Sequence, residues 1–150
     1  MIRCTLNGAA AALPAGMTLL QALRGQGLNT PRFGCGEEGC GACHVLLDGR
    51  STASCALPVE AVEARAVVTL EGLGSPDAPH PLQRAFLAEQ AGQCGFCLSG
   101  ILITAAALLG ENPDPDEAAL RAALDPHLCR CGSHNRILRA IRRAAAEMRA

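Results

Sequence analysis

The cysteines of this 150-residue chain constrain its fold more than any other feature, because eight of the nine fall into two groups of four. The first group has the spacing C-x4-C-x2-C with a fourth thiol further on, and the second has a C-x2-C pair followed by a later C-x-C pair. Residues 1–20 lack the layout of an export signal, which favours metal ligation over disulfides. The first group is Cys35, Cys40, Cys43 and Cys55, and the second is Cys94, Cys97, Cys129 and Cys131.

The first spacing is typical of a [2Fe–2S] cluster, in which one iron takes two thiolates from a tight loop and the other takes one thiolate from that loop and one from elsewhere. Glycines at 34, 36, 39 and 41 let the loop bend and bring N–H groups near the sulfurs. We therefore predict two [2Fe–2S] clusters, ligated by these eight cysteines. Zinc is the alternative, although the C-x4-C-x2-C triple and the C-x-C pair fit zinc poorly. The ninth cysteine, Cys4, is predicted to be a buried strand residue.

Composition and motifs exclude several other functions. The formal net charge of -1 gives no electrostatic reason for binding nucleic acid or an anionic membrane. The chain has no apolar run long enough to span a membrane, so we expect no membrane insertion and a cytoplasmic location, with any membrane association made through partners. A GxGxxG motif after a strand, a P-loop and an H-E-x-x-H motif are all absent. We expect no site for substrate or flavin in this chain.

Residues 1–70 carry the pattern of a small sheet with one helix. Asn7-Gly8 and Asp48-Gly49 predict hairpin turns, since both central residues of a type I′ turn need a positive φ. Thr18 and Gln21 match a capping box, and the helix that they open is predicted to stop at Gly25 or Gly27. The predicted strands are 1–6, 9–13, 44–47, 50–55 and 66–70.

After a Gly- and Pro-rich stretch from Glu71 to Pro81, the apolar residues recur at helical spacing. One helix is expected to begin at residue 82 and to close at Gly92, and a second to span 98–109 and end at Gly110. Asp114 is predicted to cap a third helix and Ser133 a fourth. Both cysteine pairs of the second group would then precede helices, whose free N–H groups stabilise thiolates.

These residues resemble the small iron–sulfur subunit of the molybdenum hydroxylases, the xanthine oxidase and aldehyde oxidoreductase group. The resemblance covers nearly the whole chain. It implies an α+β protein with a β-grasp, ferredoxin-like domain in residues 1–72, a linker in 73–81 and a four-helix [2Fe–2S]-binding domain in 82–150. The matching motifs are Gly34-Cys35-Gly36-x2-Gly39-Cys40-Gly41-Ala42-Cys43 with Cys55, Gln93-Cys94-Gly95-Phe96-Cys97-x2-Gly100 and Leu128-Cys129-Arg130-Cys131-Gly132.

The resemblance also implies a role as the non-catalytic electron-transfer subunit of an oxidoreductase. Electrons would come from a large partner subunit whose molybdopterin cofactor hydroxylates an N-heteroaromatic or aldehyde substrate. They would pass through the helical-domain cluster to the β-grasp cluster, and then to a cytochrome or a flavoprotein. Gln93 and Cys131 match positions that touch the pterin. Leu98-Ser99-Gly100 and Ser133-His134-Asn135-Arg136 look more like the small subunits of nicotinate- and isoquinoline-type enzymes.

Two functions of other classes are the alternatives. One is a freestanding two-cluster electron carrier without a molybdenum partner, and the other is a redox-inert module stapled by zinc. Glu37 and Glu38 are expected to set surface charge where the acceptor docks, and Phe96 to pack over the second cluster. The arginines of the last helix are expected to form a solvated face. The four histidines, His44, His80, His127 and His134, are expected to be structural or exposed, with His134 a candidate for tuning the second cluster.

Overall fold

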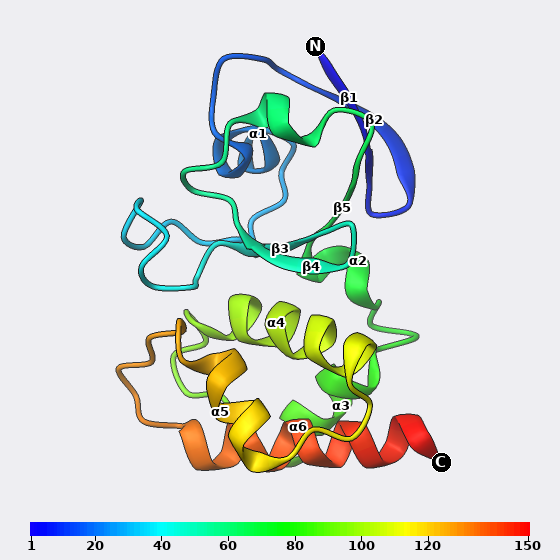
Figure 1. The fold of residues 1–150 in the computed structure, drawn as a ribbon, viewed down its shortest axis with the longest axis vertical. Helices are drawn as coiled ribbons and strands as arrows, with labels where there is room; N and C mark the ends of the chain where they lie inside the picture. Colours follow the sequence, from blue (N-terminus) through cyan, green and yellow to red (C-terminus); the bar gives the residue numbers. More distant parts are fainter.

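The computed structural model describes residues 1–150, with a sheet layer above a helical layer (Figure 1). The sheet layer contains five short strands, one helix (α1) and a single 3₁₀ turn at Val59–Val62. The strand order is β2-β1-β5-β3-β4, in which β1 and β5 are parallel and all other neighbours are antiparallel. The elements are β1 (Ile2–Leu6), β2 (Ala9–Leu13), α1 (Leu19–Gly25), β3 (His44–Leu47), β4 (Arg50–Ala53) and β5 (Ala66–Val68).

The local signals for turns and caps in this layer are confirmed. Asn7 and Gly8 have φ of 49° and 83°, and Asp48 and Gly49 have 50° and 82°. The Thr18 side chain accepts a hydrogen bond from the Gln21 N–H, and the Gln21 side chain accepts one from the Thr18 N–H. These turns set the register that sends alternate strand residues into the core.

The core of the sheet layer lies between α1 and the sheet. Cys4 is buried among its apolar residues at 6% exposure, as predicted for the ninth cysteine. A separate small cluster joins Leu20 of α1 to Cys43 and Cys55, so the core reaches the first cysteine group. The buried members of the main cluster are Cys4, Leu13, Leu19, Ala22, Leu23, Val45, Leu47, Val59, Val62 and Val67.

The helical layer contains four helices, in agreement with the four-helix prediction. They follow the short helix α2, which connects the two layers. Their shared core has sixteen buried residues, drawn from α3, α4, α5 and α6 and from Ala91 and Cys97 outside them. The bounds are α2 (Leu70–Leu73), α3 (Pro81–Ala88), α4 (Leu98–Glu111), α5 (Glu117–Leu124) and α6 (His134–Arg149).

Helix α4 is the part of the helical layer that packs directly against β3 and β4 (Figure 1). Ile101 and Leu102 belong to the helical core, whereas Ile103 is fully buried outside both cores. A helix that is apolar all round is buried on all sides. Because α4 packs on both layers, it fixes how the sheet sits on the helices.

Some predicted boundaries are wrong in detail. The cap of α5 is Asp116 rather than Asp114, because Asp116 Oδ1 accepts a hydrogen bond from the Ala119 N–H at 2.8 Å. Helix α3 ends at Ala88, and Gln90 takes a φ of 48° there, before the predicted stop at Gly92. Strand β5 ends at Val68, because α2 begins two residues later. Helix α2 has no counterpart among the predicted elements, because most of it lies in the stretch predicted to be irregular.

None of the helices combines the length and the apolar composition needed to cross a bilayer.

Candidate iron–sulfur sites

The loop 35–43 gathers its sulfurs by backbone hydrogen bonds. The N–H groups of Glu37 and Gly39 donate to Cys35 Sγ at 3.4 and 3.1 Å, and the Glu38 N–H donates to Cys55 Sγ at 3.4 Å. The structure thus brings Cys55 to the loop from beyond β4. Cys35 N–H donates to Cys40 Sγ at 3.4 Å, and the thiols of Cys43 and Cys55 are in contact. All four cysteines of the first group therefore lie together.

The environment of this loop favours thiolates at its outer edge. The hydrogen bond from the Glu37 N–H is the main reason that the pKa of Cys35 is lowered to about 7. Hydrogen bonds with Cys40 and from the Gly39 N–H contribute less. Burial raises the pKa of Cys55 in spite of the Glu38 N–H. Thiolates are the form that binds iron, so the exposed edge of the group is already adapted to a metal.

Gly34 shows how closely the loop wraps. A Cβ at Gly34 would lie 2.6 Å from Cys40 Sγ, closer than any side chain can come. The loop also needs a left-handed backbone at Gly36, where φ is 78°, and at Glu38, where φ is 64°. Gly34 is therefore favoured by the space available, and Gly36 by its backbone conformation.

The second group assembles from two segments far apart in the chain. The Cys94 thiol contacts that of Cys131, and the Cys97 thiol contacts that of Cys129. Cys97 is the N-cap residue of α4. Cys129 and Cys131 lie just before α6, which begins at His134. The predicted placement of both pairs ahead of helices is confirmed.

The thiols of the second group differ in acidity. The Phe96 N–H, with the Cys131 thiol, lowers the pKa of Cys94. Burial, with the Cys129 thiol, raises the pKa of Cys97 to about 12. Burial also opposes ionisation of Cys129. Hydrogen bonds from N–H groups just before α6, mainly that of Ser133, outweigh the effect of burial and lower the pKa of Cys129. The buried Cys97 thiol becomes a thiolate only when a cation replaces its proton.

The donors of both groups fit a [2Fe–2S] cluster. Each group offers four thiols in two contacting pairs, and each iron of such a cluster takes two protein thiolates. The pairing of the thiols therefore matches the two irons of one cluster in each group.

The two cysteine groups meet across the boundary between the layers. The Leu128 N–H donates to the carbonyl oxygen of Cys40 at 3.1 Å. Ser99 Oγ of α4 lies 3.5 Å from the carbonyl oxygen of Ala42. Because Leu128 precedes Cys129, one hydrogen bond and one peptide unit connect a cysteine of the first group with a cysteine of the second.

Gln93 and Cys131 lie together at the surface, although they are far apart in sequence. The Gln93 side-chain amide donates to the carbonyl oxygen of Cys131 at 3.2 Å. Cys94 beside them is exposed. The two residues that the family resemblance places at a pterin thus form one exposed rim of the second group.

The sequence did not indicate the setting of the aromatic and histidine side chains near the groups. Phe96 is 44% exposed, and the Arg32 guanidinium lies 5.7 Å from its ring centre. His127 is buried, and burial, with a smaller effect of His44, lowers its pKa to about 4. The His127 ring is therefore neutral near pH 7.

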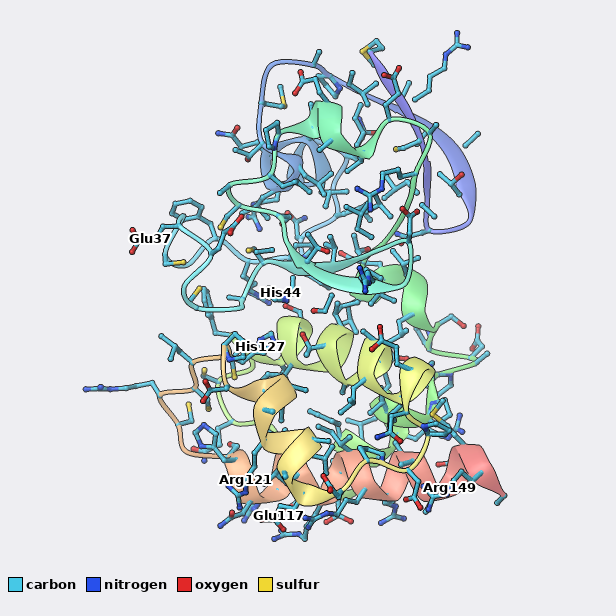
Figure 2. All side chains as sticks on the ribbon, in the orientation of Figure 1. Glu37, His44, Glu117, Arg121, His127 and Arg149 are labelled. Atoms are coloured by element: carbon cyan, nitrogen blue, oxygen red, sulfur yellow. The ribbon has the colours of Figure 1, made fainter.

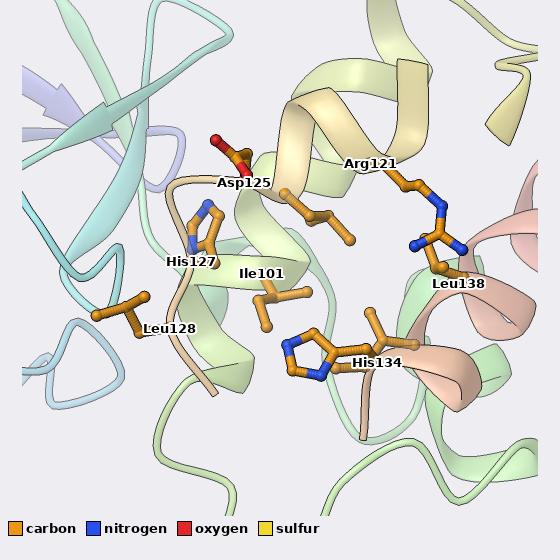
Figure 3. A pocket seen from close by; sticks show the side chains of 9 residues that line it. Ile101, Arg121, Asp125, His127, Leu128, His134 and Leu138 are labelled. Atoms are coloured by element: carbon orange, nitrogen blue, oxygen red, sulfur yellow. The ribbon is translucent and has the colours of Figure 1, made fainter. Parts of the chain in front are cut away.

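A cavity of about 440 Å³ adjoins the second group between α4, α5 and α6 (Figure 3). Ile101 and Leu138 line it, and Arg121 and His134 stand at its sides. Arg121 forms an ion pair with Glu117. His134, three residues after Cys131, therefore lines this cavity.

Both halves of the chain match models of known protein families. Residues 4–69 match the model of the 2Fe-2S iron-sulfur cluster binding domain, and residues 69–142 match that of the [2Fe-2S] binding domain. The chain therefore contains two domains of [2Fe–2S] type.

Among curated proteins, a nicotinate dehydrogenase subunit of Pseudomonas putida is 52% identical over 81% of this chain and 78% of its own length. The alpha subunit of isoquinoline 1-oxidoreductase of Brevundimonas diminuta is 49% identical over 80% of this chain and 78% of its own length. Among solved structures, aldehyde oxidoreductase from Desulfovibrio desulfuricans superimposes with a TM-score of 0.93 at 38% identity, covering 99% of this chain and 17% of that longer one. The chain belongs to the family of small iron–sulfur subunits of the molybdenum hydroxylases.

Proposed function

We propose that this chain relays electrons from a large catalytic subunit to an external acceptor through two [2Fe–2S] clusters. The observation that carries the proposal is the direct connection of the two cysteine groups by the Leu128–Cys40 hydrogen bond. Two redox centres that are held this close can exchange electrons without a diffusing carrier. We propose as ligands Cys35, Cys40, Cys43 and Cys55 for one cluster, and Cys94, Cys97, Cys129 and Cys131 for the other.

When bound, each cluster supplies a one-electron redox centre. The protein contributes N–H groups that stabilise the thiolates, from the loop in the first site and from the start of α6 in the second. It also buries Cys43 and Cys97 away from water. Hydrogen bonds and burial are the means by which a protein sets the potential of such a centre.

The partner is proposed to dock over the rim formed by Gln93 and Cys131. Two of the similar proteins are named as subunits of enzymes, and in the aldehyde oxidoreductase the matching region is part of a much longer chain. These findings support a large catalytic partner. We propose that the partner holds a molybdopterin cofactor, oxidises an N-heteroaromatic compound or an aldehyde, and delivers electrons to the second site first.

The acceptor is proposed to approach the first site. Cys35 is exposed there, and Glu37 lies at the outer tip of the same loop (Figure 2). Glu38 is exposed beside it, so the tip carries negative charge. These features support a cytochrome or a flavoprotein with a basic docking face. We also propose a cytoplasmic location, because eight of the nine cysteines are assigned to clusters and not to disulfides.

Iron and acid-labile sulfide analysis, with electron paramagnetic resonance of the dithionite-reduced chain, tests the relay. We expect about four irons per chain and two distinguishable signals, as two clusters of this type require. Zinc without iron would favour the interaction module. A chain that carries both clusters but never co-purifies with a large molybdoprotein would favour the freestanding carrier.

The docking rim is tested by Gln93→Ala, with Gln26→Ala as a control at the exposed end of α1. We expect Gln93→Ala to slow turnover and to weaken association with the catalytic subunit, because it removes the amide that meets the Cys131 carbonyl. Both signals of the isolated chain should stay. Equal association by the two variants would count against this rim.

A further inference from the structure

A row of hydrogen bonds crosses the boundary between the layers beside the two cysteine groups. Thr104 Oγ1, on α4, lies 2.7 Å from His127 Nε2 and 2.6 Å from Ser51 Oγ on β4. Ser51 Oγ in turn lies 2.7 Å from His44 Nδ1 on β3. Thr104 therefore connects the sheet layer with the segment that leads into α6.

The two ends of this row adjoin proposed cluster ligands. His44 directly follows Cys43, and His127 stands two residues before Cys129. The two imidazole rings are 4.8 Å apart in an edge-on arrangement. Figure 2 shows His44 above the boundary and His127 below it. The row thus links the backbone of one ligand segment to that of the other.

The half of the row formed by His127 and Thr104 is shielded from solvent. His127 is 6% exposed and Thr104 is 7% exposed. In such surroundings a hydroxyl or ring nitrogen without a partner is costly, and bonded groups strengthen one another. The hydrogen-bonded arrangement is therefore preferred to arrangements in which the two layers slide past each other or these side chains rotate.

His127 also presses on the first ligand loop. A Cβ at Gly41, where φ is 79°, would lie 2.2 Å from His127 Nδ1, and a Cβ at Gly100 would lie 2.0 Å from the Gly41 carbonyl oxygen. His127 Nδ1 itself is buried without a hydrogen-bond partner. The imidazole ring is therefore packed as a spacer between α4 and the Cys40–Cys43 loop, and the bond to Thr104 keeps it in that place.

We propose that Thr104 and His127 are positioning residues, which hold the Cys40–Cys43 loop and the segment before Cys129 at one fixed spacing and thereby set the electronic coupling between the two clusters. This proposal rests on the proposed function, since it presupposes a cluster in each group. It assigns to the polar row a role beyond packing. If these side chains only filled space, any side chain of the same shape would serve at this boundary. The row of hydrogen bonds requires hydroxyl groups at Thr104 and Ser51.

The test replaces Thr104 by Val, which keeps the shape and removes the hydroxyl, with Thr104→Ser as the matched variant that keeps the hydroxyl. The cluster-containing full chain is used for both. We expect Thr104→Val to retain all its iron, to alter the spin–spin splitting of both reduced signals, and to slow electron equilibration between the clusters by several-fold after rapid partial reduction. Thr104→Ser should restore the wild-type splitting and most of the rate.

A Thr104→Val chain with wild-type splitting and rate would overturn the proposal, even if its Tm is lower, because a merely structural role moves Tm alone. If Thr104→Val does not retain iron, Ser51→Ala is used instead, at a half-buried position between Thr104 and His44. It should shift both signals in the same direction by a smaller amount, and unchanged signals would overturn the proposal. A wild-type chain without two signals would instead overturn the proposed function itself.

Discussion

Each cysteine group brings four thiols together, but the two groups are held by different parts of the fold. In the first, three of the four thiols come from the single loop 35–43, and the N–H groups of that loop already point at its own sulfurs. In the second, two thiols stand at the start of α4 and two just before α6. The first group is therefore a property of a local loop, and the second is a property of helix packing.

This difference sets what each group depends on. The loop of the first group requires glycines and a few residues with positive φ, which local sequence supplies. The second group exists only while α4 and α6 pack together in the helical core. We therefore expect damage to the first group to stay local, and damage to the second to follow the stability of the helical layer.

The largest effects on cluster content should come from removing one cysteine ligand from either group. Cys43→Ser should abolish one paramagnetic signal and about half of the iron, and Cys129→Ser should abolish the other, because each cluster needs four protein ligands. Cys4→Ser is the control, since Cys4 lies in the sheet core away from both groups. Iron analysis and electron paramagnetic resonance report the outcome. Loss of both signals in Cys43→Ser would contradict the separation of the two sites.

A smaller effect is expected where the two sites meet. Gly100→Ala places a Cβ 2.0 Å from the Gly41 carbonyl oxygen, so the backbone of the first loop has to move away from α4. We expect destabilisation by about 1–3 kcal/mol, as for overpacked cores. Thermal or denaturant unfolding of the cluster-containing chain measures it.

Gly110→Ala is the matched control on the same helix. Nothing lies within 4 Å of a Cβ at Gly110. Because alanine has the higher helix propensity, this change should stabilise the chain by up to about 1 kcal/mol. If both alanine variants were equally stable, the close contact between α4 and the loop would not be a constraint on the fold.

The sequence predicted features that depend on near neighbours. The two hairpin turns, the Thr18 capping box and the helices ahead of the cysteine pairs follow from residue types within a few positions of one another. The local pattern puts the α5 cap two residues early, because Asp114 and Asp116 offer the same chemistry and only the Ala119 hydrogen bond distinguishes them. The grouping of the eight cysteines was predictable because their spacing reflects the geometry of the cluster.

Contacts between the layers were not predictable in the same way. The apolar pattern of α4 indicated the face that holds Ile101 and Leu102, but not that Ile103 and Thr104 face a second partner. His127, Ser51 and His44 lie in three separate segments, each ordinary on its own. The β3–β4 hairpin brings His44 and Ser51 together. Only the packing of the sheet on α4 adds Thr104 and His127, so no local spacing could indicate the whole row.

The smallest effect is expected on the outer face of α6. The sequence suggested a solvated arginine face, and the structure shows that most of its arginines pair with acids from outside α6. Arg142 of α6 and Arg121 of α5 both pair with Glu117, and Arg139 and Arg143 pair with Glu89 (the Glu117, Arg121 and Arg149 side chains are marked in Figure 2). These pairs are exposed, so each contributes little and is screened by salt.

Glu117→Gln tests this face, with Glu111→Gln as a control outside these ion pairs. The Arg121 and Arg142 guanidinium groups lower the pKa of Glu117 below its ordinary 4.5. A carboxyl group with a lowered folded-state pKa stabilises the fold above pH 4.5, and that contribution disappears as the pH falls through the lower, folded value. At pH 7 and low salt, Glu117→Gln should therefore lower the Tm slightly, with both paramagnetic signals unchanged. The difference from wild type should vanish in high salt and in acid, and a deficit that persisted in acid would show that Glu117 acts through packing and not through charge.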